Sequence, residues 1–423
     1  MRKTATILIW TISLTVAAAA WSQEPVELSG HWEGAIEVPG QPLQVKVDLA
    51  LEAGEWSGTI DIPAQGVRGL ALDGFSVEEG EQGVEVRFAI RGVPGNPTFL
   101  GKLEDGEIRG IFTQGGARLR FVLGRDAVEA PARPQEPRPP FPYEIEEARY
   151  PSGDVQLAGT LTVPPGDGPF PAVLLISGSG AQDRNEEIFG HKPFLVLADH
   201  LTRAGIAVLR VDDPGVGGST AYANPATTAD FAGDAEAGLE YLKGHPRVDP
   251  GRIGIVGHSE GGAIAPIVAS RSEVVAFIVL LAGPGMPGSE LLRKQNERIF
   301  EASGFDEKRW EKLGSLLDEL FDALTDEEDS ARRRERVLEV VRRQFEVNGI
   351  ARDQQDPAQV ELAAEGADNA WMRYFLAYDP RPALRATRVP VLAVNGELDL
   401  QVDAEQNLTA IEAALEEAGN DDV

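Results

Sequence analysis

Apolar and polar residues alternate along the first part of the chain. The alternation is clearest at residues 43–51 and 84–90, and glycine or Asp-Gly turns separate such segments. A period of two residues is that of a strand with one buried face. Residues 23–125 are therefore predicted to form a small all-β domain of about eight short strands, either a sandwich or a barrel.

From residue 143 onward the pattern changes to nearly continuous apolar runs separated by helical stretches. The runs lie at residues 173–176, 207–211, 253–256, 276–281 and 391–394. Such runs are typical of strands buried on both faces of a parallel sheet. We predict an α/β fold over residues 143–423, with a mostly parallel sheet covered by helices on both sides. Ligands of such sheets bind at the carboxyl ends of the strands.

Two segments interrupt this organisation. Residues 126–142 are rich in proline and are predicted to form an extended linker between the two domains. Residues 286–379 are charged and carry apolar residues at helical spacing, as in Leu313, Leu316, Leu317 and Leu320. This segment is predicted to be a helical cap inserted into the sheet domain.

Composition and charge exclude several classes of function. The 423 residues include 39 Lys and Arg against 68 Asp and Glu, a formal charge of −29, so neither nucleic acid nor an anionic membrane is an expected partner. The sequence contains no cysteine, which excludes disulfides, thiolate nucleophiles and cysteine-ligated metals. We expect no cofactor and no metal, and a nucleophile that carries oxygen or nitrogen.

The first 22 residues have the pattern of a secretory signal peptide. Arg2 and Lys3 precede an apolar run at residues 5–20 that ends in four alanines. The run is shorter than a membrane-spanning helix, which favours cleavage near Ser22 over an uncleaved anchor. We expect an exported product, periplasmic or extracellular, without a membrane segment after cleavage. The sequence gives no indication of the oligomeric state.

A candidate nucleophile follows the apolar run at residues 253–256, in Gly257-His258-Ser259-Glu260-Gly261. Glycines two residues before and after a serine allow a tight turn from strand to helix that exposes the hydroxyl, so Ser259 is the predicted nucleophile. The backbone amide of Glu260 is one expected donor to a tetrahedral oxyanion. The second is predicted to be the amide of Ser179, in the glycine-rich loop after residues 173–176, with Gly180 as the alternative.

Three acids follow the apolar run at residues 391–394. Asp403 has Gln406 three residues on, the spacing of a helix capping box. Asp399 is predicted to be the acid that orients a catalytic base, with Glu397 as the alternative.

Residues 176–187, the turn at Ser259 and residues 390–403 together resemble the α/β-hydrolase superfamily. Within it they resemble bacterial exported esterases akin to prolyl-oligopeptidase-type hydrolases, which carry a small β domain in front. The resemblance implies hydrolysis of a small-molecule carboxylic ester through an acyl-enzyme. A serine peptidase of the prolyl-oligopeptidase type is the alternative. Such relatives usually read Asp-Arg-Gly after the fourth strand, whereas this chain has Asp213-Pro214-Gly215.

In this order of triad residues a histidine follows the acid. None does in this sequence, because all five histidines precede Asp399: His31, His191, His200, His245 and His258. The side chain of His258 is expected to point away from that of Ser259. We expect the sequence to be a fragment, with the histidine, a last strand and a closing helix beyond residue 423. A non-catalytic binding protein is the alternative that the missing histidine leaves open.

Overall fold

The computed structural model describes residues 28–38, 42–52, 54–63, 67–80, 83–90, 97–114, 117–125, 133–188, 190–302, 307–420 and 422. The predicted signal peptide and residues 126–132 of the predicted linker lie outside these ranges. In the described part of the chain, no helix has both the length and the apolar character needed to cross a membrane.

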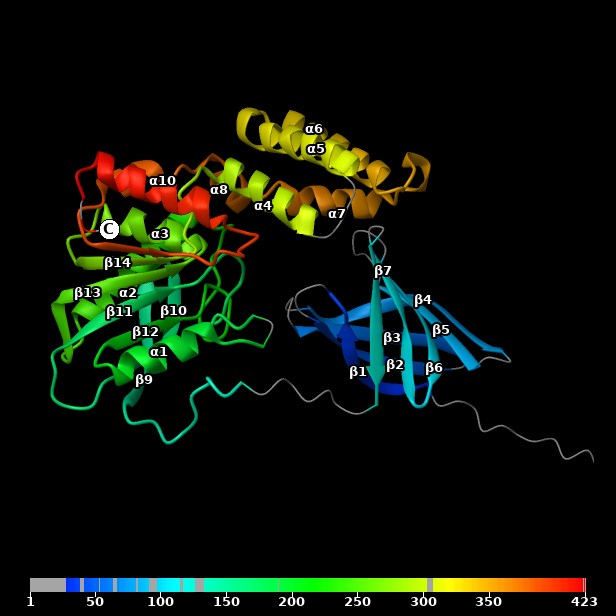
Figure 1. Cartoon of the computed structure of the whole chain (residues 1–423), viewed down its shortest axis with the longest axis horizontal. Coiled ribbons are helices and arrows are strands. Elements are labelled where there is room, and N and C mark those ends of the chain that lie inside the picture. The colour runs from blue at the N-terminus through cyan, green and yellow to red at the C-terminus, as the bar shows by residue number, and fades with distance from the viewer. Residues whose placement is uncertain are drawn as a thin grey trace, which may run out of the picture.

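The first eight strands form a closed antiparallel barrel (Figure 1). Each strand pairs with the next, and β1 also pairs with β8, which closes the ring. The strands are β1 (Gly30–Ile36), β2 (Leu43–Glu52), β3 (Glu55–Ile62), β4 (Val67–Gly80), β5 (Gly83–Ile90), β6 (Thr98–Glu104), β7 (Glu107–Gln114) and β8 (Ala117–Gly124). The all-β prediction is confirmed; of the two architectures that the sequence allowed, the barrel is right and the sandwich is wrong.

Side chains fill the interior of the barrel, because an eight-stranded ring is only wide enough to hold them. Phe99 on β6 is fully buried, and its ring lies 4.8–5.0 Å, between centroids, from those of Phe88, Phe112 and Phe121. The next residue, Leu100, points outward and is 45% exposed. The alternation seen in the sequence is therefore the alternation between core and surface.

Phe99→Ala should lower the free energy of unfolding of the barrel by about 3–5 kcal/mol, because it leaves a cavity among three aromatic rings. Leu100→Ala, one residue away on the outer face, should change it by less than about 0.5 kcal/mol. Urea unfolding of both variants measures the difference. Equal losses in the two variants would contradict the packed interior.

The second domain is built on a seven-stranded sheet with the order β15-β14-β13-β11-β12-β10-β9. The β9–β10 and β10–β12 pairs are antiparallel and the other four pairs are parallel. The strands are β9 (Glu144–Ser152), β10 (Val155–Val163), β11 (Phe170–Ile176), β12 (Ala207–Val211), β13 (Val248–His258), β14 (Val275–Leu281) and β15 (Val391–Val394). This arrangement confirms the predicted mostly parallel sheet.

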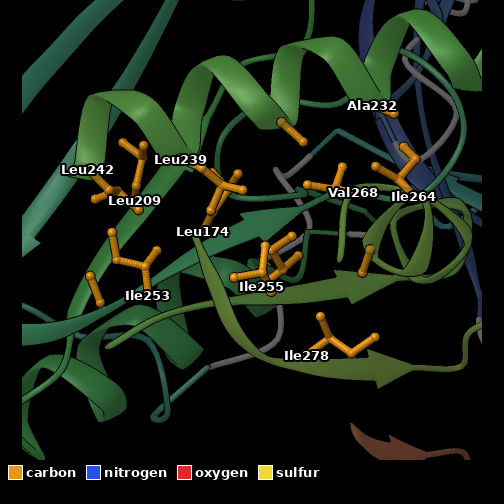
Figure 2. Close-up of a cluster of buried hydrophobic side chains, with 14 of the residues drawn as sticks. Leu174, Leu209, Ala232, Leu239, Leu242, Ile253, Ile255, Ile264, Val268 and Ile278 are labelled. Carbon is orange, nitrogen blue, oxygen red and sulfur yellow. The ribbon is translucent and has the colours of Figure 1, made fainter. Parts of the chain in front are cut away.

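Helices cover both faces of this sheet. Figure 2 shows Leu174 and Ile255 of the strands beside Leu239 of α2 and Ile264 of α3 in one buried cluster. Val173, which precedes Leu174 on β11, packs instead on the opposite face with α1. The helices around the sheet are α1 (Pro193–Arg203), α2 (Thr228–Lys243), α3 (Glu260–Ala269), α9 (Arg381–Ala386) and α10 (Ala404–Glu417). Burial on two faces explains why the strands read as unbroken apolar runs.

Five helices between β14 and α9 form the predicted cap (Figure 1). They are α4 (Gly288–Ala302), α5 (Glu307–Asp326), α6 (Ser330–Val347), α7 (Pro357–Ala367) and α8 (Ala370–Ala377), with a 3-10 turn at Arg352–Gln354. The cap has an apolar core of its own, which includes Leu320, Val337 and Val341. Its last helix, α8, also contacts α2 of the sheet domain.

Strand β15 lies at the edge of the sheet, and its Leu392 and Val394 are exposed. The backbone amide of Val391 donates a hydrogen bond to the carbonyl of Asp422 (2.9 Å). That a further strand and helix continue the fold stays a prediction.

Candidate active site

Ser259 occupies the turn between β13 and α3, with backbone angles φ 50° and ψ −113°. A side chain in this left-handed region costs about 1–3 kcal/mol, which the surrounding structure must offset. The flanking glycines make the turn possible. A Cβ on Gly257 would lie 2.0 Å from the carbonyl oxygen of Gly261, and one on Gly261 would lie 2.2 Å from that of Ile176.

Backbone hydrogen bonds hold this turn from both sides. The Ser259 amide donates to the carbonyl of Leu281 on β14 (2.9 Å), and its carbonyl accepts from the amide of Gly262 (2.8 Å). The side chain is half-buried, and its hydroxyl has no hydrogen-bond partner among the described residues. The hydroxyl is therefore available to a ligand at the amino end of α3, where the helix dipole favours negative charge.

The loop of residues 177–188 after β11, which we call the β11 loop, lies directly against this turn. A Cβ on Gly178 would be 3.3 Å from the Cβ of Ser259. The amide of Ser179 has no acceptor within the described part of the chain. The amide of Glu260, the first residue of α3, has no acceptor within its helix. The two amides predicted to bind an oxyanion are thus both unused near Ser259.

Glu186 fixes the β11 loop to the end of β13, a contact that the sequence did not indicate. Its side chain is only 3% exposed, and its backbone has a positive φ of 51°. One carboxylate oxygen, Oε1, accepts hydrogen bonds from the amide of Gly178 (2.7 Å) and from Nδ1 of His258 (2.7 Å). The amide of Gly178 is therefore not available to an oxyanion.

The ring of His258 is directed to Glu186, and no hydrogen bond joins it to Ser259 within the described residues. Burial lowers the pKa of His258, but the hydrogen bond to Glu186 and the charges of Glu186 and Asp399 outweigh burial, so its pKa is raised. The end of β15 lies near the same turn, because the amide of Ala282 donates to the carbonyl of Val394 (2.8 Å) and the amide of Ser259 donates to the carbonyl of Leu281 (2.9 Å).

Asp399 lies in the loop after β15, where its Oδ1 accepts from the amides of Gln401 (2.8 Å) and Val402 (3.1 Å). These bonds orient the carboxylate.

Asp403 caps α10 through the amide of Gln406 (3.0 Å), as predicted. The reciprocal bond of a capping box is missing, because Oε1 of Gln406 is buried without a partner in the described structure. Asp403 also pairs with Arg298 of the cap (2.8 Å).

The side chain of Glu260 connects the turn to the cap, a contact that the sequence did not reveal. The residue is 3% exposed, and its Oε1 accepts from the hydroxyl of Thr228 on α2 (2.6 Å) and from Nε1 of Trp371 on α8 (2.7 Å). Burial raises the pKa of Glu260, although both hydrogen bonds favour the ionised form.

Asp213, in the loop after β12, holds the β11 loop from its other side. Its two carboxylate oxygens accept from the hydroxyl of Ser177 (2.9 Å) and the amide of Gln182 (2.9 Å). Burial raises the pKa of Asp213 to about 7, and the nearby charges of Glu260 and Glu186 add to the rise.

A cavity of about 650 Å³, which we call the cap cavity, opens beside these groups. Its walls come from the β11 loop, the loop after β12, α2 and α8, and include Ser179, Gly180, Asp213, Tyr222, Phe231 and Trp371. The volume is that of a pocket for a small organic ligand. Among the described residues, no group of three or more potential ligands could hold a metal ion.

A sequence model of the alpha/beta hydrolase family matches residues 173–420, more than half of the chain, so this protein belongs to that family. This match confirms the resemblance to the α/β-hydrolase superfamily that the sequence motifs indicated. The narrower likeness to exported, prolyl-oligopeptidase-type esterases stays a prediction.

Curated relatives match part of the chain. This chain is 34% identical over 139 residues to esterase EstD of Thermotoga maritima and 28% identical over 143 residues to esterase FrsA of Vibrio vulnificus. The alignment with EstD covers 33% of this chain and 33% of the relative, and the alignment with FrsA covers 34% and 32%. The chain therefore spans about a third of the length of these relatives. The solved structure of esterase Pf2001 from Pyrococcus furiosus is 17% identical, with 66% of this chain and 79% of that chain covered and a TM-score of 0.41.

Glu186→Gln should lower the free energy of unfolding by about 1–3 kcal/mol, because it weakens two buried hydrogen bonds to a charged group. It should also lower the pKa of His258, which NMR titration measures. Since the native pKa of His258 is raised, its pairing with Glu186 stabilises the fold below the ordinary value of 6.5 and loses this effect as pH rises through the native value. The loss in the variant should therefore be larger at acidic than at alkaline pH.

The matched control is Glu187→Gln, which changes an adjacent carboxylate that lies 3.8 Å from the ammonium of Lys192 and is 47% exposed. It should leave both the stability and the pKa of His258 unchanged. An unchanged His258 pKa in Glu186→Gln would show that the contact does not govern this histidine.

Proposed function

We propose that this protein is a serine esterase that cleaves carboxylic esters of small molecules through an acyl-enzyme. The observation that carries the proposal is Ser259, at a strained strand-to-helix turn, whose hydroxyl has no hydrogen-bond partner among the described residues. The nearby amides of Ser179 and Glu260 likewise donate no hydrogen bond within the described part of the chain. The similarity of part of the chain to the esterases EstD and FrsA supports ester chemistry. We also propose that residues 1–22 direct export.

In the proposed reaction, Oγ of Ser259 attacks the ester carbonyl carbon, and the carbonyl electron pair moves to oxygen. The amides of Ser179 and Glu260 stabilise this oxyanion. An imidazole oriented by Asp399 accepts the hydroxyl proton and passes it to the departing alcohol. Water then attacks the acyl-enzyme in the same manner, releasing the acid and restoring Ser259.

His258 is adjacent to Ser259 in sequence, yet we propose that it is not this base. Its Nδ1 is bonded to the buried carboxylate of Glu186, and its ring makes no hydrogen bond with Ser259 in the described structure. We assign it the role of fixing the turn against the β11 loop. In this proposal the base that Asp399 orients is therefore not His258.

Ser259→Ala should abolish covalent labelling by a fluorophosphonate probe, because the probe reacts with an activated serine hydroxyl. The control is Ser270→Ala, which removes a hydroxyl that bonds only within the end of α3 (2.7 Å to the carbonyl of Ile267). Mass spectrometry of the labelled peptide identifies the site. Failure of the full-length, unsubstituted gene product to label would favour a non-catalytic binding protein, and labelling that persists in Ser259→Ala would assign the nucleophile elsewhere.

Asp399→Asn should lower kcat for p-nitrophenyl acetate by about 10³- to 10⁴-fold with a small change in KM, because the amide cannot stabilise an imidazolium. Glu397→Gln, an exposed acid two residues away, should have little effect. His258→Gln should keep most of the activity. The reverse ranking of Asp399→Asn and His258→Gln would make His258 the base. Faster hydrolysis of aminoacyl anilides than of acyl esters would favour a peptidase.

A further inference from the structure

A second, smaller cavity adjoins the cap cavity. It measures about 60 Å³, room for a group no larger than a few waters, and we call it the inner cavity. Four residues line both cavities: Gly180, Asp213, Pro214 and Phe231. A ligand in the cap cavity would therefore meet Asp213 and Phe231 at the junction.

Three aromatic side chains line the cap cavity, two from the sheet domain and one from the cap. Tyr222 and Phe231 lie with ring centroids 6.2 Å apart, and Trp371 lines the same cavity from α8. Two of the rings are held by hydrogen bonds to buried acids: Tyr222 donates to Asp234 (2.7 Å) and Trp371 donates to Glu260 (2.7 Å). The faces of such rings attract cations, ammonium groups above all.

Three acidic residues that form no salt bridge within the described part of the chain line the inner cavity. Asp213, Asp234 and Glu260 all line the inner cavity, and no Lys or Arg among the described residues lines either cavity. The neighbouring Asp212 does not add to this set, because Arg184 neutralises it (2.7 Å). Asp234 is 9% exposed, and its Oδ1 is buried without a hydrogen-bond partner in the described structure.

We propose that the cap cavity binds a positively charged ammonium group of the ester substrate, between the aromatic rings and the carboxylate of Asp213. This inference rests on the proposed function only in calling the ligand a substrate. Binding of an ammonium group at this site does not require a working triad. A cation compensates a buried carboxylate that no protein cation neutralises. Ser179 and Gly180 line the same cavity, so the ester carbonyl of such a substrate would lie at the β11 loop.

Burial keeps the pKa of Asp213 near 7, and a bound ammonium group would favour the ionised carboxylate. Binding should therefore release protons from this group. An uncharged ligand of the same shape would make the same contacts with the apolar walls, but it would leave the three acids without a counter-charge.

Isothermal titration calorimetry with choline, and with the alcohol in which a tert-butyl group replaces its trimethylammonium group, tests the proposal. We expect choline to bind roughly tenfold more tightly than its uncharged analogue. Asp213→Asn should reduce this preference to less than about twofold. The control variant Glu240→Gln removes one carboxylate from the exposed surface of α2 and should leave the preference intact.

Because Asp213 also holds the β11 loop, a second variant leaves all polar groups in place. Phe231→Leu should weaken choline binding by about three- to tenfold and change binding of the uncharged analogue little, since it removes only a ring face. Equal affinity for the two ligands, or a preference that survives both variants, would overturn the proposal. Failure of fluorophosphonate labelling with an intact choline preference would overturn the esterase and leave the cation site standing.

Discussion

The strained turn at Ser259 is the constraint around which the sheet domain is arranged. The turn exists only where β11, β13 and the start of α3 approach to backbone contact, which requires glycine at 257 and 261. The same approach places the β11 loop beside the serine. A side chain at either glycine would clash with the backbone of the neighbouring segment and force the turn and the β11 loop apart. The conformation at Ser259 therefore depends on the same close backbone packing that joins β11, β13 and α3.

Three buried carboxylates connect the turn at Ser259 to the surrounding elements. Glu186 ties the β11 loop to β13, Asp213 ties the same loop to β12, and Glu260 reaches α2 and the cap. Each accepts hydrogen bonds that would otherwise be unsatisfied in the interior, which is the condition for keeping a polar group there. The cap is therefore connected to the turn itself, because the indole of Trp371 on α8 donates a hydrogen bond to Glu260, the residue after Ser259.

The sequence predicted what depends on local pattern. Period-two alternation in residues 43–51 and unbroken apolar runs such as residues 173–176 predicted the two domains, and the spacing of Gly257, Ser259 and Gly261 predicted the turn. It could not predict contacts made by side chains distant along the chain. Glu260 meets Trp371 across 111 residues and Glu186 meets His258 across 72, and no local pattern specifies either pair. The choice between sandwich and barrel likewise depended on the pairing of β1 with β8, which alternation alone leaves open.

The closed ring of β1–β8 also limits how the first domain can recognise anything. Every strand of the ring has a neighbour on both sides, so none of them offers its whole length as an edge onto which an extended peptide could add. Buried apolar side chains, among them Trp32, Phe88, Phe99 and Phe121, occupy its interior. The outward side chains of the strands, rather than backbone edges, are therefore the larger surface that this domain presents to a partner.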